Sequence, residues 1–131
     1  MKKGYFGNIE DLTTENTNFR KVLYTGEKMQ LVLMTLQPGE EIGAEVHDGH
    51  DQFFRFEEGV GKVIVNESEY EVGDGDSVIV PSGANHNVIN TSDSELLKLY
   101  TIYTPPEHKE GTLHATKVEA VEEHFDGTTT E

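Results

Sequence analysis

Short runs of strand-forming residues recur through most of the chain and limit the folds that it can adopt. Between Phe19 and Tyr103 these runs follow one another at intervals of about 8–12 residues and end at Gly, Pro, Asn or Asp. Short strands at this spacing are typical of an all-β sandwich or barrel. The predicted strands are Phe19–Tyr24, Met29–Leu36, Ile42–His47, Gln52–Glu57, Gly61–Val65, Tyr70–Val72, Ser77–Val80, His86–Asn90 and Leu96–Tyr103.

The two ends of the chain lie outside this pattern. Near the C-terminus, Thr116 with Glu119 three residues later resembles a capping box, which predicts a short helix over Lys117–His124. The length of 131 residues suits a single domain with one core. We expect that domain to consist of an N-terminal arm (1–18), a barrel (19–104) and a C-terminal tail with the short helix (105–131).

One predicted strand, Met29–Leu36, carries apolar side chains at both its odd and its even positions. Both faces of such a strand should be buried. In a domain of this size a covered outer face suggests a homodimer, although a second sheet or the tail could also cover it.

The charge of the chain limits its partners. The net charge is −15, from 25 acidic and 10 basic residues, and such a surface repels phosphate backbones, so nucleic acid is not expected. No apolar run is long enough to cross a membrane, and the first residues lack the apolar segment of a secretory signal. The chain also contains no cysteine, which rules out a disulfide framework. We therefore expect a cytoplasmic protein whose partner is a small molecule.

Two stretches carry side chains that could hold a metal ion. Glu45 and His47 are two apart on a predicted strand, so their side chains point to the same face, and Gln52 begins the next strand. The second stretch, Gly75–Asn90, is predicted to form a strand, a tight turn and a strand that carries His86 inward. These four residues predict a site for one divalent first-row metal (Mn, Fe, Ni, Cu or Zn). The alternative is that they are ordinary polar residues of a barrel without metal.

The two stretches resemble the paired motifs of the cupin superfamily. This resemblance implies a double-stranded β-helix (jelly-roll) barrel, and it groups the chain with small single-domain cupins labelled mannose-6-phosphate isomerase-like. The first motif is matched in its spacing from Gly39 to Gly59. The second motif is matched at every position, by Gly75, Pro81, Gly83, His86 and Asn90.

The first motif departs from the cupin pattern at two ligand positions. Glu45 stands where the motif has a histidine, and Gln52 stands where it has a glutamate. The four predicted ligands thus include one carboxylate. A site with this charge and a bound divalent ion would have a net charge of about +1 and would act as a Lewis acid. The neutral amide of Gln52 should bind weakly and favour an open coordination position.

Two classes of function fit these features. The first is a metal-dependent enzyme that acts on a small organic molecule, either by O2-dependent cleavage or by isomerisation or ring opening of a sugar, with catalytic residues left unassigned. The alternative is a non-catalytic small-molecule or metal-binding module. A phosphosugar substrate is disfavoured because no cluster of Lys or Arg accompanies either motif.

The remaining histidines and aromatic residues have plainer interpretations. His50 lies in a loop among acids, where it is predicted to be a rim residue rather than a ligand. We expect the tail histidines, His108, His114 and His124, to be solvated. If Gln52 faces inward, alternation also sends Phe54 and Phe56 inward, as core or as pocket wall.

Overall fold

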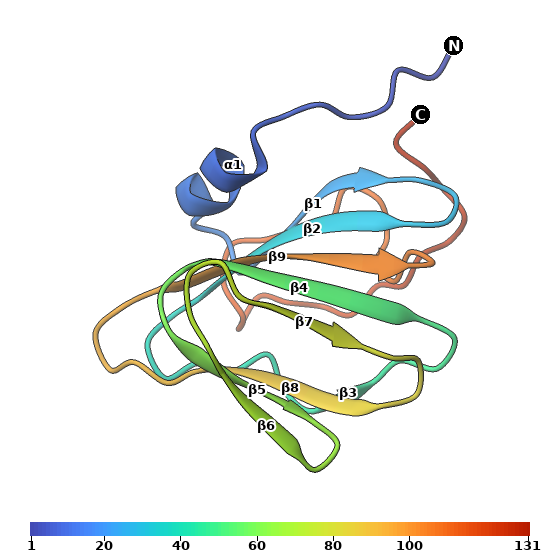
Figure 1. Cartoon of the computed structure of the whole chain (residues 1–131). Coiled ribbons are helices and arrows are strands. Elements are labelled where there is room, and N and C mark those ends of the chain that lie inside the picture. Colours follow the sequence, from blue (N-terminus) through green and yellow to red (C-terminus); the bar gives the residue numbers. More distant parts are fainter.

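The computed structural model describes residues 1–131 and contains two antiparallel β-sheets that face each other (Figure 1). The larger sheet has six strands in the order β10-β1-β2-β9-β4-β7, and the smaller has four in the order β3-β8-β5-β6. The predicted all-β barrel is thereby confirmed. The elements are α1 (Ile9–Glu15), β1 (Arg20–Thr25), β2 (Gln30–Leu36), β3 (Glu45–Val46), β4 (Asp51–Glu58), β5 (Gly61–Val65), β6 (Ser68–Val72), β7 (Ser77–Val80), β8 (Asn85–Asn90), β9 (Leu97–Thr104) and β10 (Leu113–His114).

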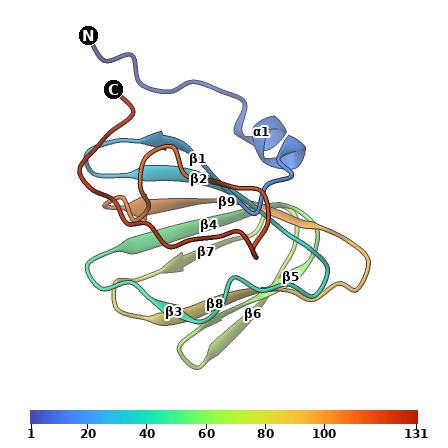
Figure 2. The same cartoon turned by 180° about the vertical axis from the view of Figure 1, so that it is seen from behind.

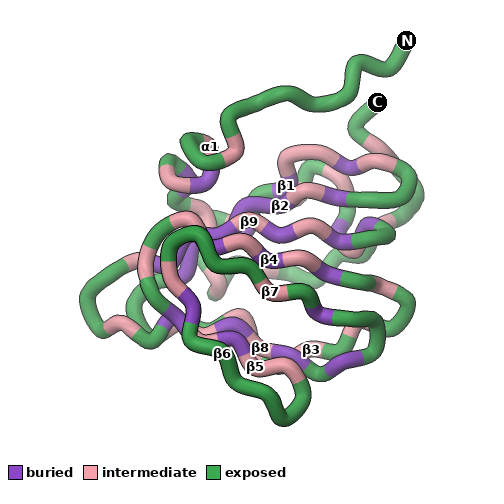
Figure 3. Tube along the Cα trace, in the orientation of Figure 1, coloured by how far each residue is buried: buried purple, intermediate pink, exposed green.

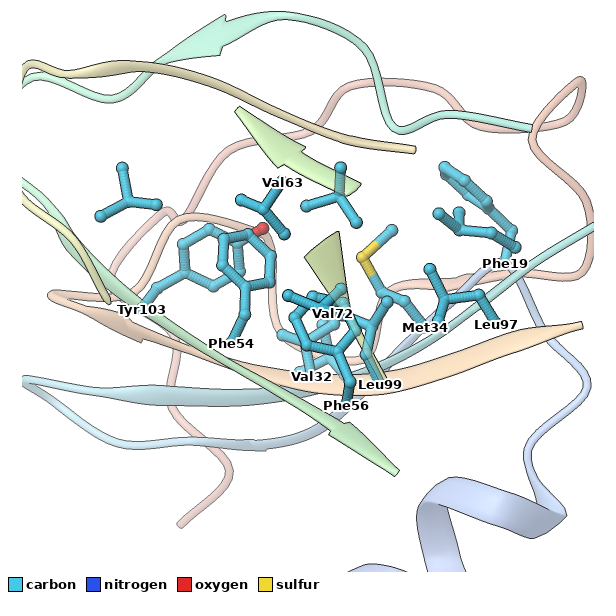
Figure 4. Packing of buried hydrophobic residues seen from close by; sticks show 14 of the residues in the cluster. Phe19, Val32, Met34, Phe54, Phe56, Val63, Val72, Leu97, Leu99 and Tyr103 are labelled. Carbon is cyan, nitrogen blue, oxygen red and sulfur yellow. The ribbon is translucent and has the colours of Figure 1, made fainter. Parts of the chain in front are cut away.

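The core fills the space between the two sheets. Along β4, Gln52, Phe54 and Phe56 are buried, whereas Phe53 and Arg55 between them are partly exposed, as strand alternation predicts (Figure 3). Figure 4 shows Phe54 and Phe56 packed side by side among aliphatic side chains of the core. Burial of each such side chain stabilises the fold by about 1.5–3 kcal/mol.

Two motif residues, Gly59 and Asn90, stabilise the turns at the end of the barrel opposite β3. Gly59 has φ of 95°, and a Cβ at this position would lie 2.2 Å from the Leu96 carbonyl oxygen, so only glycine fits there. The side-chain amide of buried Asn90 donates to the carbonyl oxygens of Leu36, Gln37 and Glu95. Asn90 therefore stabilises the end of its strand.

The helix lies at the other end of the chain from the one predicted. Helix α1 forms within the N-terminal arm, where the Asn8 side chain accepts a hydrogen bond from the Asp11 backbone N–H at 3.0 Å. It is the one helix of the structure, and it is too short and too polar to cross a membrane. This helix packs on the outer face of the larger sheet, where the Lys98 ammonium reaches the Thr14 carbonyl oxygen.

The predicted C-terminal helix over Lys117–His124 is wrong. Only its first turn forms: the Ala120 N–H donates to the Lys117 carbonyl. Beyond it, the segment pairs in extended form with the start of the tail, through Lys109 N–H to Glu123 O and Phe125 N–H to Glu107 O. These backbone bonds replace those of a helix because they pair the segment with residues 107–109.

The tail crosses the open side of the barrel (Figure 2). Strand β10 pairs with β1 at the edge of the larger sheet, and the Lys117 ammonium donates to the Glu41 carbonyl oxygen, just before β3 of the smaller sheet, at 2.5 Å. The tail thereby bridges the two sheet edges. This places its residues beside the motif stretch around Glu45.

Candidate metal centre

The structure brings three of the four predicted ligands together. One ligand atom each from Glu45, His47 and His86 lies within 4.8 Å of the other two. Glu45 and His86 are direct partners in the pairing of β3 with β8, and the rings of His47 and His86 are 5.3 Å apart between centroids. The two motif stretches therefore face each other.

His47 follows β3 rather than lying within it, since the observed strand ends at Val46. Its carbonyl oxygen accepts a hydrogen bond from the Gly83 N–H at 3.2 Å, which joins the loop after β3 to the turn before β8. His86 is buried, and its Nδ1 lies 3.3 Å from the Ala84 carbonyl oxygen. A carbonyl can only accept, so this contact favours the tautomer that keeps the Nε2 lone pair free for a metal.

Gln52 lies on the larger sheet, beside this cluster. It is a register partner of Tyr103, whose ring is 5.8 Å from the His47 ring. The amide nitrogen of Gln52 donates to Thr101 Oγ1 at 3.0 Å, which fixes the orientation of the amide. Its Oε1 is buried and has no hydrogen-bond partner.

The donor atoms of this cluster fit a metal ion. Glu45 Oε2 and His47 Nε2 are 2.6 Å apart, yet the buried His47 Nε2 makes no hydrogen bond of acceptable geometry. Gln52 Oε1 is a second buried atom without a partner, and such atoms in native proteins require an explanation. Imidazole nitrogen, carboxylate and amide oxygen are all ligands for first-row divalent metals, so the residue types gathered here suit such an ion.

The pKa values of the clustered residues depend on one another, and they link metal binding to proton release. Burial acts to raise the pKa of Glu45, but His47, followed by Arg20 and His86, lowers it below its ordinary value. The Glu45 contact raises the pKa of His47, and burial lowers the pKa of His86. Because the Glu45 contact favours a proton on His47, metal binding should be coupled to release of that proton.

A tail residue that the sequence motifs do not indicate lies next to the cluster. Glu107 Oε1 is 3.7 Å from His47 Nδ1 and 3.2 Å from His124 Nδ1, and its Oε2 is 3.2 Å from His50 Nε2. His50 is thus a rim residue, as predicted, and contacts Glu107 instead of joining the three clustered ligands. The Glu107 side chain is 11% exposed, so its charge is largely shielded from water.

The prediction that all three tail histidines are solvated is wrong for two of them. His108 is buried, its Nε2 is 3.2 Å from the Tyr103 hydroxyl, and burial lowers its pKa to about 3. His114 is partly buried, and its Nδ1 has no hydrogen-bond partner. Only His124 is exposed. The sequence could not reveal this because the burial comes from the path of the tail.

A buried arginine is the other residue that the motifs do not indicate. Arg20 is 6% exposed and shares the inner face of β1 with Val22, while Lys21 between them is exposed. The alternation Arg-Lys-Val in the predicted strand Phe19–Tyr24 was the available signal, since one of two adjacent basic residues must face inward.

The larger surface grooves are not lined by the clustered residues Glu45, His47 and His86. The largest, of about 500 Å3, is lined in part by Val60 and Lys62, and another of about 380 Å3 is lined in part by His114 of the tail. The Glu45 side chain is 25% exposed, so the cluster meets solvent at this residue.

The fold and the paired motifs define a class. The model of the cupin domain matches residues 32–103, more than half of the chain, and the chain belongs to the cupin family. Among individual proteins, the chain is similar to the uncharacterised protein YrkC of Bacillus subtilis, with 45% identity over 91% of this chain and 67% of that protein. It is also similar to the uncharacterised protein L612 of Acanthamoeba polyphaga mimivirus, with 36% identity over 82% of this chain and 69% of that protein.

A solved structure extends this similarity to three dimensions. The crystal structure of BH2720 from Bacillus halodurans superimposes with a TM-score of 0.86 and 44% sequence identity, covering 88% of this chain and 92% of that one. The names of these three relatives describe no activity. The function must therefore be argued from the site.

Proposed function

We propose that this cupin holds one divalent first-row transition metal through Glu45, His47, Gln52 and His86, and that it is an enzyme acting on a small organic molecule. The observation that carries the proposal is the convergence of ligand atoms from Glu45, His47 and His86 within 4.8 Å, in a barrel where the neighbouring Gln52 Oε1 is buried without a hydrogen-bond partner. A satisfied polar core would not leave Gln52 Oε1 unpaired.

The bound metal would supply Lewis acidity that stabilises negative charge developing on a substrate oxygen. The protein residues have separate tasks. His86 is fixed by its strand, and Gln52 is oriented by Thr101. Glu45 is the most exposed of the four, so it is the carboxylate that an incoming molecule meets and the candidate general base.

Two reaction types remain compatible with this arrangement. O2-dependent cleavage of an enolisable or diol substrate needs a redox-active metal such as Fe, Mn, Ni or Cu. Isomerisation or ring opening of a sugar or uronate needs only proton transfer and a Lewis acid, which Zn also provides. A non-catalytic binding module is the alternative. The observation in its favour is that the tail covers His47, with Glu107 Oε1 3.7 Å from His47 Nδ1.

Elemental analysis of natively purified protein tests the proposal. We expect about one equivalent of a first-row metal per chain, with thermal stability that falls on chelation because the metal binds only the folded state. Protein that is metal-free yet fully stable would contradict the ligand assignment. Oxygen uptake with diketones and diols, and NMR of sugar and uronate mixtures, then separate the reaction types. Metal without turnover in either assay would favour the binding module.

A further inference from the structure

Gln30, the first residue of β2, is a buried amide whose hydrogen bonds connect the barrel to the tail. Its Nε2 donates to Thr25 Oγ1 at 2.9 Å and to the His108 carbonyl oxygen at 2.7 Å. Its Oε1 accepts from the backbone N–H of His108 at 3.0 Å and from that of Glu107 at 3.3 Å. Both donors and both acceptor positions of the amide are therefore used, and three of the four bonds go to the tail.

Gln30 also lies level with the metal centre on the larger sheet. Its register partner on β9 is Tyr103, and the partner of Tyr103 on β4 is Gln52, the predicted amide ligand. All three residues are buried, and the Tyr103 ring is 5.8 Å from the His47 ring. The bonds of Gln30 thus fix the tail at the end of the barrel where the clustered ligands lie.

The tail residue held in this way carries the carboxylate that faces a ligand ring. The backbone N–H of Glu107 is bonded to Gln30, and its side-chain Oε1 is 3.7 Å from His47 Nδ1. The two bonds between Gln30 and His108 are buried, so water does not compete with them. The side chain of His124, in contrast, is exposed where it meets Glu107. The Gln30 amide is therefore the shielded anchor of this part of the tail.

We propose that Gln30 is a positioning residue of the metal centre, which holds the backbone of residues 107–108 so that the Glu107 carboxylate faces His47 Nδ1. This inference rests on the proposed function. A carboxylate beside a ligand imidazole fixes the orientation of the ring and raises its basicity as a ligand. Without the Gln30 amide, the buried backbone groups of the tail would lose their partners and move towards water, because a buried polar group left unpaired is unfavourable.

A pair of substitutions tests this route. Gln30→Met removes all four hydrogen bonds and leaves a side chain of similar size. We expect it to lower Zn2+ affinity in titration calorimetry by about tenfold and to shift the absorption bands of the Co2+ form as Glu107→Gln does. Because both changes act on one contact, Gln30→Met should alter the affinity by less than about twofold in the Glu107→Gln background. Losses that add in the double variant would overturn the proposal.

Asn90 supplies the matched control. Its buried amide also holds distant backbone, by donating to three carbonyl oxygens, but at the end of the barrel opposite β3. Asn90→Leu should lower the melting temperature, as Gln30→Met should, and leave the Zn2+ affinity and the Co2+ spectrum of the folded protein unchanged. Equal effects of the two variants on metal binding would indicate a general loss of order and would also overturn the proposal.

A measurement on chelator-treated protein separates this proposal from the proposed function. The ring-proton NMR signals of His47, identified with His47→Ala, should move in Gln30→Met in the same direction as in Glu107→Gln. Wild-type protein that takes up no Zn2+ would contradict the proposed function, whereas matching shifts in the metal-free samples would still support the placement of Glu107 by Gln30. His47 signals that ignore Gln30→Met would contradict that placement.

Discussion

Glu45 and His86 lie directly opposite each other in the antiparallel register of β3 and β8. A slip of one residue would turn Glu45 to the outer face of the sheet, so this register is what joins the two motifs into one site. Strand β3 is only two residues long and lies at the sheet edge. A side-chain bond just before it, from the Gly43 N–H to Asn87 Oδ1 at 2.9 Å, helps to hold it against β8.

The first prediction separates the ligand histidines from the rim histidine. His86→Ala should lower metal affinity by more than about tenfold, since loss of one ligand bond exceeds 1.4 kcal/mol. His50→Ala should leave affinity nearly unchanged, because His50 contacts Glu107 and not the clustered ligand atoms. Titration calorimetry with Zn2+ measures both. The reverse pattern would mean that the wrong histidine was assigned.

The second prediction concerns Glu107. A metal at His47 Nε2 leaves Nδ1 facing the Glu107 carboxylate 3.7 Å away, and partners of this kind orient the ligand ring. Glu107→Gln should weaken metal binding by about 10–100-fold and alter the Co2+ absorption spectrum, with the fold intact. His124→Ala is the matched control, because it removes a tail contact of Glu107 and keeps the one to His47. Equal effects of the two variants would indicate that Glu107 only anchors the tail.

The barrel and the three clustered ligands were accessible from sequence because their signals are local. Strand alternation, the glycine turns and the spacing around Glu45 and His86 each depend on a few neighbouring residues. Glu107 was missed because its contacts with His47 and His50 join distant segments of the chain. The helix predicted in the tail failed for the same reason: backbone pairing with residues 107–109 outweighs the local capping pattern around Thr116.

The third prediction is a pH dependence of stability due to His108. Burial lowers its pKa from 6.5 to about 3, so above pH 6.5 neither the folded nor the unfolded chain binds this proton. As the pH falls from 6.5 towards 3, the unfolded chain takes up a proton that the folded chain refuses, and stability is lost. At about 1.4 kcal/mol per unit, the loss from pH 7 to 5 is about 2 kcal/mol.

His108→Gln removes this titration and keeps a hydrogen-bonding group beside Tyr103. In urea unfolding of chelator-treated protein, wild type should lose about 2 kcal/mol more than the variant between pH 7 and 5. Between pH 7 and 9 the two proteins should change in parallel, which serves as the internal control. Equal losses on the acid side would show that His108 is protonated in the folded protein.

The fourth prediction concerns the outer face of the larger sheet. Leu31, Ile102, Phe53 and Ile79 are successive register partners on β2, β9, β4 and β7, so they form an apolar row across the sheet. Helix α1 covers the face only near Lys98, and Ile79 is 68% exposed. The neighbouring charges, Lys21, Arg55 and Glu57, nearly cancel in a chain of net charge −15. A second copy of the chain could therefore pack here without the repulsion that the rest of the surface would cause.

We accordingly predict a homodimer, with twice the 14.6 kDa mass of the chain in light scattering. Ile79→Glu would place a buried charge in each half of a two-fold interface and should convert the dimer to monomer. The side chain is exposed in the single chain, so the variant should retain the melting behaviour of a folded monomer. Val121→Glu, at an exposed tail position, adds the same charge away from the face and should remain dimeric. A wild-type monomer at all concentrations, or dissociation by both variants alike, would contradict packing through this row.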